Sequence, residues 1–215
     1  MAQEKTQSEL GQMAPTVRAV ANVGSYNKKK RTVEVTAATD YPVTRWMYDQ
    51  TKRDYVDFNE ILSFAPEHMN AERLEQGVVP LLDNHNRFGG AEGVRGVVSD
   101  YNTENGQLNA TVRFSKREES QAIADDVEDG ILKGFSLGYR VHEYTPDGTT
   151  GENGLPNYVA TRWEPLELSA APIPADPRST ARSIDDVKNK HTAQVIRKIE
   201  ETPTPAPKPK KETPQ

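Results

Sequence analysis

The stretch GFSLGYRV, residues 134–141, decides between two kinds of fold for this chain. Its first five residues spell G-x-S-x-G around Ser136, the motif that α/β-hydrolases place on a sharp turn between a strand and a helix. Here Leu137, Tyr139 and Val141 recur at every second position, which is the pattern of a strand. Because a strand and not a helix follows the serine, the stretch argues against an α/β-hydrolase.

The segments on both sides of this stretch also predict strands that are joined by short turns. Asn105 and Gly106 form a hairpin signal, and a glycine-containing loop follows the stretch. Strands joined by turns rather than by helical crossovers pair antiparallel, and such a sheet can close into a barrel. The predicted strands cover residues 17–23, 33–37, 78–85, 94–98, 108–114, 137–141 and 158–169.

Two helices and one irregular segment complete the predicted domain. Residues 66–76 and 116–129 have helical punctuation or spacing, and Ser115 with Glu118 has the spacing of a capping box. Residues 41–64 show no regular pattern, and their aromatic side chains are expected to cover one end of the core. The predicted fold class is α+β: a mainly antiparallel small barrel of about seven strands with surrounding helices and disordered termini.

The composition of the chain changes towards both termini. Residues 1–15 are polar and predict a disordered arm, and residues 16–182 predict the folded domain. Residues 183–200 carry apolar positions at helical spacing and predict an amphipathic helix. Residues 201–215, ETPTPAPKPKKETPQ, predict a disordered tail rich in proline and lysine.

Charge and composition exclude several classes of function. The net charge of -5 gives no electrostatic support for nucleic-acid binding. The chain has no cysteine, which excludes disulfides, thiolate zinc sites and a cysteine nucleophile. No apolar run approaches the ~20 residues that span a bilayer, so we expect a soluble, cytoplasmic protein with no membrane partner.

A serine nucleophile needs a base within hydrogen-bond reach. His85 is the preferred base, because it ends a predicted apolar strand and is followed by turn-forming residues. His68 lies in a charged helix, His142 is only six positions from Ser136, and His191 lies in the outlying helix, so none of them is favoured.

A carboxylate should orient the histidine. Strand alternation in RWEPLELSAAP places Glu167 on the face opposite Leu168, and we prefer it to Glu164; Pro165 can shift that alternation, and Asp83 is the reserve candidate.

Each of these three residues also has a purely structural interpretation. Ser136 can be a small residue at a tight junction between a helix and a strand, and His85 can be a hydrogen-bonded turn residue. Glu167 can be an ordinary glutamate on an exposed strand face.

Four segments together resemble the tailed-phage prohead proteases, the serine peptidases of capsid maturation, which are similar to the herpesvirus assemblins. The resemblance extends over roughly residues 17–180 and is strongest at a histidine after an apolar strand, a serine in G-F-S-L-G-Y, and a glutamate before a serine and a P-A-x-P loop. The segments are LLDNHNR (81–87), RGVVSDYNTENGQLNATVRFS (95–115), DGILKGFSLGYRV (129–141) and WEPLELSAAPIPADP (163–177).

The resemblance implies a serine endopeptidase in which Ser136 is the nucleophile, His85 the general base and Glu167 the orienting acid, with no metal or cofactor. It implies cleavage of the capsid protein, the scaffold and the protease itself, inside an assembling procapsid in the host cytoplasm. The portal and the procapsid shell are further implied partners, and the assemblins suggest a homodimer.

Two other functions stay open on the sequence. One is a catalytically inactive scaffold or capsid-assembly module with the same fold. The other is an unrelated esterase that uses the G-x-S-x-G motif.

Overall fold

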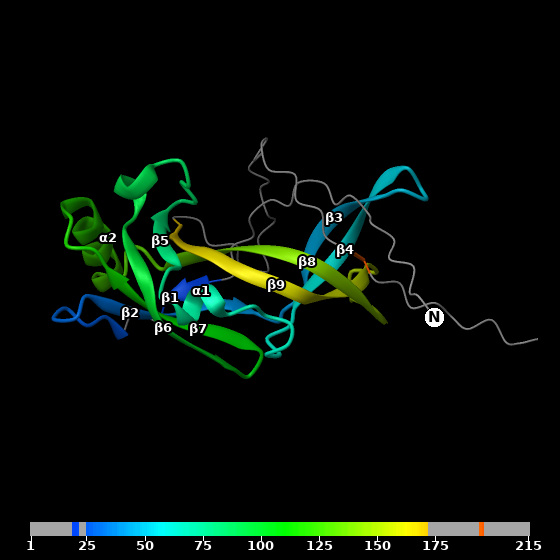
Figure 1. Cartoon of the computed structure of the whole chain (residues 1–215), viewed down its shortest axis with the longest axis horizontal. Helices are drawn as coiled ribbons and strands as arrows, with labels where there is room; N and C mark the ends of the chain where they lie inside the picture. The colour runs from blue at the N-terminus through cyan, green and yellow to red at the C-terminus, as the bar shows by residue number, and fades with distance from the viewer. Residues whose placement is uncertain (1–18, 22–24, 172–193, 196–215) are drawn as a thin grey trace, which may run out of the picture.

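β-Strands dominate the structure, a computed structural model that describes residues 19–21, 25–171 and 194–195 (Figure 1). Two α-helices and a 3-10 turn are described beside them. The strands are β1 (Ala19–Ala21), β2 (Thr32–Thr39), β3 (Val43–Asp49), β4 (Asp54–Leu62), β5 (Pro80–Asp83), β6 (Gly96–Glu104), β7 (Gln107–Phe114), β8 (Gly134–Thr150), β9 (Pro156–Ala170) and β10 (Gln194–Val195). The helices are α1 (Glu72–Glu75) and α2 (Glu118–Glu128), and the 3-10 turn is η2 (Gly90–Gly93).

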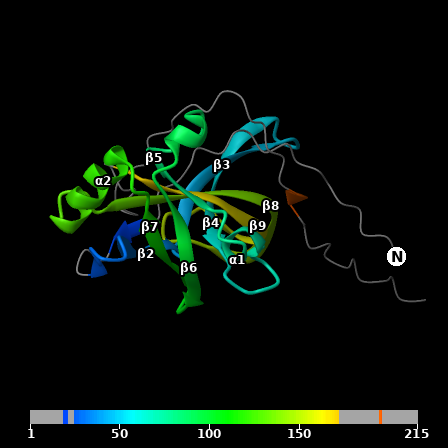
Figure 2. The same ribbon diagram turned by 60° about the vertical axis from the view of Figure 1, so that its left-hand side comes forward.

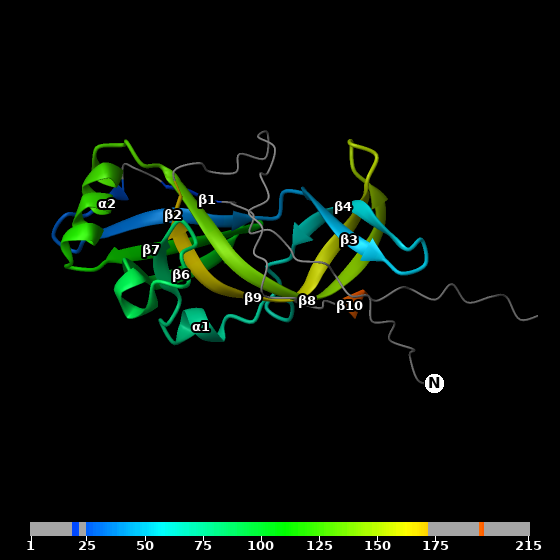
Figure 3. The ribbon, with the colours of Figure 1, turned by 90° about the horizontal axis from the view of Figure 1, so that it is seen from above.

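The described strands form one mixed sheet in the order β10-β8-β1-β2-β7-β6-β5-β9-β4-β3, and β8 also pairs with β9. Strands β4 and β5 run parallel to β9, and β10 runs parallel to β8, whereas the other pairs are antiparallel. Figures 2 and 3 show β8 and β9 as the longest elements, with α2 at one end and the β3 and β4 hairpin at the other.

The predicted fold class is therefore wrong. The molecule is a mostly β, mixed sheet and not a mainly antiparallel small barrel surrounded by helices. Hairpin signals report only neighbours along the chain, whereas the parallel pairs join β9 to strands about 80 to 100 residues earlier, as in Leu81 opposite Leu168 and Asn59 opposite Asn157. Helix α1 has only 4 residues, so it covers little of the sheet.

The β3 and β4 hairpin occupies most of the segment that the sequence predicted to be irregular. The usual arrangement of apolar side chains inward and polar side chains outward is reversed at several positions of this hairpin. Arg45 is buried, while Tyr48 and Tyr55 lie on the outer face and pair across the two strands. An inward arginine with outward aromatic residues does not produce the usual apolar alternation, so the strands were not recognised.

The β6 and β7 hairpin confirms the turn predicted at Asn105 and Gly106, whose φ angles are 53° and 71°. Positive φ at both central residues is what a tight hairpin turn requires. Helix α2 is present, but the capping box is wrong: Arg117 is the N-cap residue and makes no side-chain capping bond, and Ser115 Oγ accepts a hydrogen bond from the Arg117 amide instead.

The core lies between the strands and is filled mainly by their inward side chains. Trp163 is fully buried, and its indole nitrogen donates to the carbonyl of Ser63 at 2.8 Å. The largest fully buried hydrophobic side chains are Trp163, Tyr144, Phe58, Phe114, Phe135, Leu62, Leu81, Leu108, Leu137 and Leu168.

The predicted arm at residues 1–15 and the predicted tail at 201–215 lie outside the described residues. So does most of the predicted helix at 183–200; at Gln194–Val195 the chain is the strand β10, not a helix. Within the part of the chain that the structure describes, no helix is both long enough and apolar enough to cross a membrane.

Candidate functional site

The three predicted site residues come from elements that meet around Ser169 of β9. Ser136 lies on β8 directly opposite Ser169, and Leu82 of β5 lies opposite Ser169 on its other side. His85 follows β5 by two residues, and Glu167 lies on β9 two residues before Ser169. The sheet topology therefore brings together residues that are 31 to 82 positions apart in the sequence.

His85 is held by a left-handed turn at the end of β5. Asn84 and His85 have φ angles of 46° and 58°, and the Asn84 amide donates to the carbonyl of Ala170 at 2.9 Å. The turn directs the imidazole to β9, where His85 Nδ1 lies 2.7 Å from Glu167 Oε1. Two successive residues in this backbone region are unusual and store strain that surrounding contacts must offset.

Glu167 is a buried carboxylate with three polar partners. Ser169 Oγ donates to Oε2 at 2.7 Å, and Arg87 Nη2 lies 3.3 Å from Oε1, which also contacts His85. Burial alone would raise the pKa of Glu167, but the hydrogen bond and charge of His85, the Ser169 hydroxyl and the Arg87 charge outweigh it, and the net pKa lies below its ordinary value. Glu167 is therefore an ionised hydrogen-bond acceptor at neutral pH.

Glu167 should make the stability of the protein depend on pH in the acid range. Since its pKa is lower in the folded chain than the ordinary 4.5, its contribution is fully present above pH 4.5 and is lost as the pH falls through the lowered folded value. We expect Glu167→Gln to reduce the free energy of unfolding near neutral pH and to flatten its decline below pH 4.5, measured by urea unfolding at several pH values. Glu152→Gln, a change at an exposed loop residue, should keep the wild-type pH profile. Parallel profiles for wild type and Glu167→Gln would contradict this assignment.

Two polar atoms of the site are buried without a hydrogen-bond partner among the described residues: Ser136 Oγ and His85 Nε2. Nδ1–H donation to Glu167 fixes the neutral ring in the tautomer that leaves Nε2 as an acceptor. A carboxylate that orients an imidazole in this way is the arrangement that lets a histidine accept a proton from a hydroxyl. The catalytic roles of Ser136, His85 and Glu167 stay predictions.

Because Gly138 has no side chain, the Glu167 carboxylate can pack directly against the backbone of β8. This explains the second glycine of the G-x-S-x-G motif. A Cβ on Gly138 would lie 2.0 Å from Glu167 Oε1 and 2.7 Å from Arg87 Nη2. Gly138, Arg87 and Ser169 are the site residues that sequence reasoning missed. The signals were the N-H-N-R sequence, which puts Arg87 two residues after His85, and the strand alternation that puts Ser169 on the same face as Glu167.

The rejected candidates lie elsewhere in the described structure. Glu164 contacts His142 Nε2 at 3.1 Å and Arg73 Nε at 3.3 Å. His68 Nδ1 lies 2.7 Å from Ser63 Oγ, and the Asp83 side chain is exposed. His191 lies outside the described residues.

A second buried polar cluster, which the sequence did not predict, joins the hairpin to β8. Arg45 Nε lies 3.3 Å from Glu60 Oε1, and Arg45 Nη2 donates to the Tyr139 hydroxyl at 2.7 Å. The hydroxyls of Tyr139 and Tyr144 donate to the two carboxylate oxygens of Glu60. Burial raises the pKa of Tyr144, and the Glu60 charge raises it further, so Tyr144 is a neutral donor.

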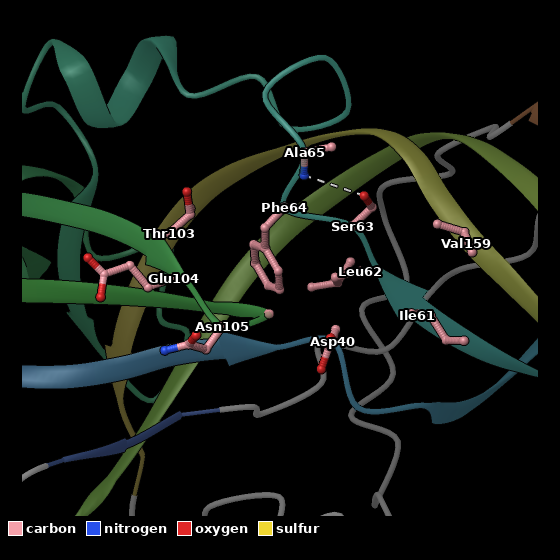
Figure 4. Close-up of a pocket in the computed structure, with 11 residues that line it drawn as sticks. Asp40, Ile61, Leu62, Ser63, Phe64, Ala65, Thr103, Glu104, Asn105 and Val159 are labelled. Atoms are coloured by element: carbon pink, nitrogen blue, oxygen red, sulfur yellow. Dashed lines mark hydrogen bonds between the residues drawn. The ribbon is translucent and has the colours of Figure 1, made fainter.

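The lining of a pocket of about 400 Å³ includes no residue of either polar cluster and none of the predicted site residues. Figure 4 shows Phe64 and Leu62 near its centre, with Glu104 and Asn105 on another wall. Within the described ranges, no group of three or more His, Asp or Glu side chains is placed to hold a metal ion. The pocket lining is Asp40, Ile61, Leu62, Ser63, Phe64, Ala65, Thr103, Glu104, Asn105, Gly106 and Val159.

Comparison with known proteins gives a match to a phage capsid protein. The major capsid protein of Halomonas phage phiHAP-1 is 32% identical to this chain over 144 residues, which is 66% of this chain and 22% of that protein. The chain therefore spans less than a quarter of the length of the relative that it matches. No family model matches the chain, and no solved structure matches it.

This match contradicts the predicted serine endopeptidase. The relative is named as a major capsid protein and not as a peptidase. The phage and capsid setting is supported, whereas a capsid protein as substrate is not. The resemblance to prohead proteases stays a prediction.

Proposed function

We propose that this chain is a capsid-assembly module of a tailed phage, with a structural role in the phage particle as it assembles inside the host cell. The identity of 32% to the phiHAP-1 major capsid protein, over most of this chain, carries the proposal. Because the aligned part is 22% of that protein, the same module can form one segment of a much longer capsid polypeptide. Its partner on this proposal is the major capsid protein in the growing shell.

In such a module, the site formed by His85 and Glu167 would stabilise the structure. It fastens the loop between β5 and β6 to β9 through the carboxylate of Glu167, and the His85 amide adds a bond of 3.1 Å to Ser169 Oγ. Hydrogen bonds to charged groups contribute about 1.5–3 kcal/mol each. The site therefore keeps an otherwise exposed loop, with Asn86 and Phe88 at its surface, in one conformation.

Co-expression with the cognate major capsid protein tests the proposal. We expect this chain to co-sediment with assembled shells, and the yield of closed shells to fall when it is omitted. Shells made with Ser136→Ala should contain capsid protein of the same mass as shells made with wild type, since a structural role needs no nucleophile. Intact-mass spectrometry of the shell proteins and electron microscopy of the shells provide the two readouts.

Ser99→Ala is the matched control, because Ser99 is an exposed serine on β6 away from the site. The opposite result is a capsid protein that is shortened by the wild-type chain and by Ser99→Ala, but not by Ser136→Ala. That result would replace the structural role by an enzymatic one. Absence of the chain from shells of every kind would also contradict the proposal.

A further inference from the structure

The pocket of about 400 Å³ lies where β3 and β4 separate. Beyond the pair formed by Val43 and Glu60, β4 continues along one wall of the pocket without a partner residue on β3. On the other side, the Asp40 amide donates to the carbonyl of Gly106 at 2.8 Å, which joins this part of the chain to the β6 and β7 hairpin. The volume between these segments is within the range of about 300–1,000 Å³ that is typical of small-ligand sites.

The wall that follows β4 is fixed by contacts with Trp163 and His68. The carbonyl of Ser63 accepts a hydrogen bond from the buried Trp163 indole at 2.8 Å, and Ser63 Oγ lies 2.7 Å from His68 Nδ1. The Phe64 ring, near the centre of the pocket in Figure 4, packs at 83° to the Trp163 ring with 5.7 Å between ring centres. The wall is therefore preformed, and a ligand does not have to order it.

The lining combines negative charge with apolar surface. Asp40 and Glu104 are exposed carboxylates, and within the described residues neither of them is part of an ion pair. The lining contains no lysine, arginine or histidine, and Phe64 is its largest apolar side chain. Because a positive charge is attracted by carboxylates and by aromatic rings, this lining favours a cation on an apolar stem.

The Asp40 carboxylate has a defined position beside the pocket. A Cβ on Gly106 would lie 2.2 Å from Asp40 Oδ2, so the carboxylate packs against the hairpin turn where only glycine leaves room. The φ angle of 71° at Gly106 also favours glycine. Since the Asp40 amide is bonded to the same residue, backbone and side chain of Asp40 are both held at the turn. A charge held in this way can select a ligand by its geometry.

Arginine is the cation that fits this lining best. Its guanidinium is planar, binds carboxylates through two parallel hydrogen bonds and stacks on aromatic rings, and its stem is apolar. A metal ion would find two carboxylates in the lining and no third Asp, Glu or His. Four lining residues at the mouth are exposed, so an arginine of another protein can reach the pocket from solvent; they are Asp40, Thr103, Glu104 and Asn105.

We propose that this pocket binds an arginine side chain from a partner protein, in a segment where apolar residues flank the arginine. Asp40 and Glu104 bind the guanidinium, Phe64 contacts its face, and the apolar lining receives the stem. The inference goes beyond the proposed capsid function and does not depend on it, because it rests only on the chemistry of the pocket.

NMR titration of the full chain with the blocked peptide acetyl-Gly-Leu-Arg-Leu-Gly-amide tests the proposal. We expect saturable shifts at the amides of residues 61–65 and 103–106, with affinity that falls as salt increases. The same peptide with citrulline, the neutral isostere of arginine, should leave these amides unchanged. No saturable shift with the arginine peptide, or equal shifts with the citrulline peptide, would overturn the proposal. Binding of the free amine agmatine without binding of the peptide would contradict a protein partner.

Two substitutions test the charges without changing side-chain size. We expect Asp40→Asn and Glu104→Gln each to weaken binding of the arginine peptide roughly tenfold, the loss typical of one hydrogen bond to a charged group, with unchanged NMR spectra away from the pocket. Asp57→Asn is the matched control, because Asp57 is an exposed carboxylate of β4 outside the lining, and it should keep the wild-type affinity. Equal affinities in all four proteins would contradict the assignment of the two carboxylates.

Discussion

Glu60→Ala is expected to destabilise the protein by about 3–5 kcal/mol, the cost of removing the Glu60 carboxylate from the buried charge of Arg45. The Arg45 side chain is only 6% exposed and Glu60 is 0% exposed, so water cannot replace the lost contact. The change also removes the acceptor of the Tyr139 and Tyr144 hydroxyls. Urea unfolding at neutral pH, followed by tryptophan fluorescence, measures the effect.

A paired replacement separates the buried charge from the rest of the loss. Because an apolar pair of similar volume often matches a buried ion pair in stability, Arg45→Met combined with Glu60→Leu should recover part of what Glu60→Ala loses. Glu104→Ala, at an exposed position of β6, should change the free energy of unfolding by less than about 0.5 kcal/mol. A Glu60→Ala protein as stable as Glu104→Ala would show that this cluster does not hold the hairpin to β8.

Gly138→Ala is the second substitution with a large expected effect. The added methyl group would lie 2.0 Å from Glu167 Oε1, so either β8 or the Glu167 carboxylate must move. Overpacking of this kind costs about 1–3 kcal/mol. Displacement of Glu167 would also release His85, whose Nδ1 it binds at 2.7 Å. We expect a loss of stability in urea unfolding together with changed NMR chemical shifts of the His85 ring at neutral pH.

Gly93→Ala is the matched control for this effect. The nearest atom to a Cβ on Gly93 is the Asn86 carbonyl oxygen at 3.6 Å, which is an ordinary van der Waals contact. This variant should keep both the stability and the His85 ring chemical shifts of the wild type. If Gly138→Ala also keeps them, the close packing of β8 against Glu167 is not what positions the histidine.

The local signals in the sequence predicted the hairpin at Asn105 and Gly106, but they missed the β3 and β4 hairpin and the parallel pairs of the sheet. Asn105 and Gly106 specify their turn by backbone conformation alone, so that hairpin was predictable. The parallel neighbours of β9 depend on contacts between segments that are far apart in the sequence. A period-2 pattern identifies a strand but does not show which distant strand it pairs with. Helix 66–76 shortened to Glu72–Glu75 because proline and glycine mark boundaries but do not supply the apolar contacts that stabilise a helix.

The site was predictable only in part, because local strand patterns identify some of its residues but not the contacts between them. Strand alternation favours Glu167 over Glu164, and the structure places Glu167 beside His85. A register shift between Gly138 and Tyr139, opposite Glu167 and Pro165, leaves Leu166 without a partner on β8, so the simple alternation used for this choice does not continue from Glu167 to Glu164. The N-H-N-R sequence and the strand alternation of β9 place Arg87 and Ser169 near the site, but they do not show that either side chain reaches the Glu167 carboxylate, as the structure does. Function was not predictable from the three residues, since the comparison supports a capsid setting and contradicts the peptidase.

Strand β9 links the two polar clusters of the molecule. One end of β9 pairs with β5 next to His85, the other end pairs with β4 in the hairpin, and β8 accompanies it along most of its length. Its residues therefore have neighbours on both edges at both ends, and it cannot separate from one cluster without straining the other. A load applied to the hairpin would be carried along β9 and its neighbour β8 to the loop that holds His85.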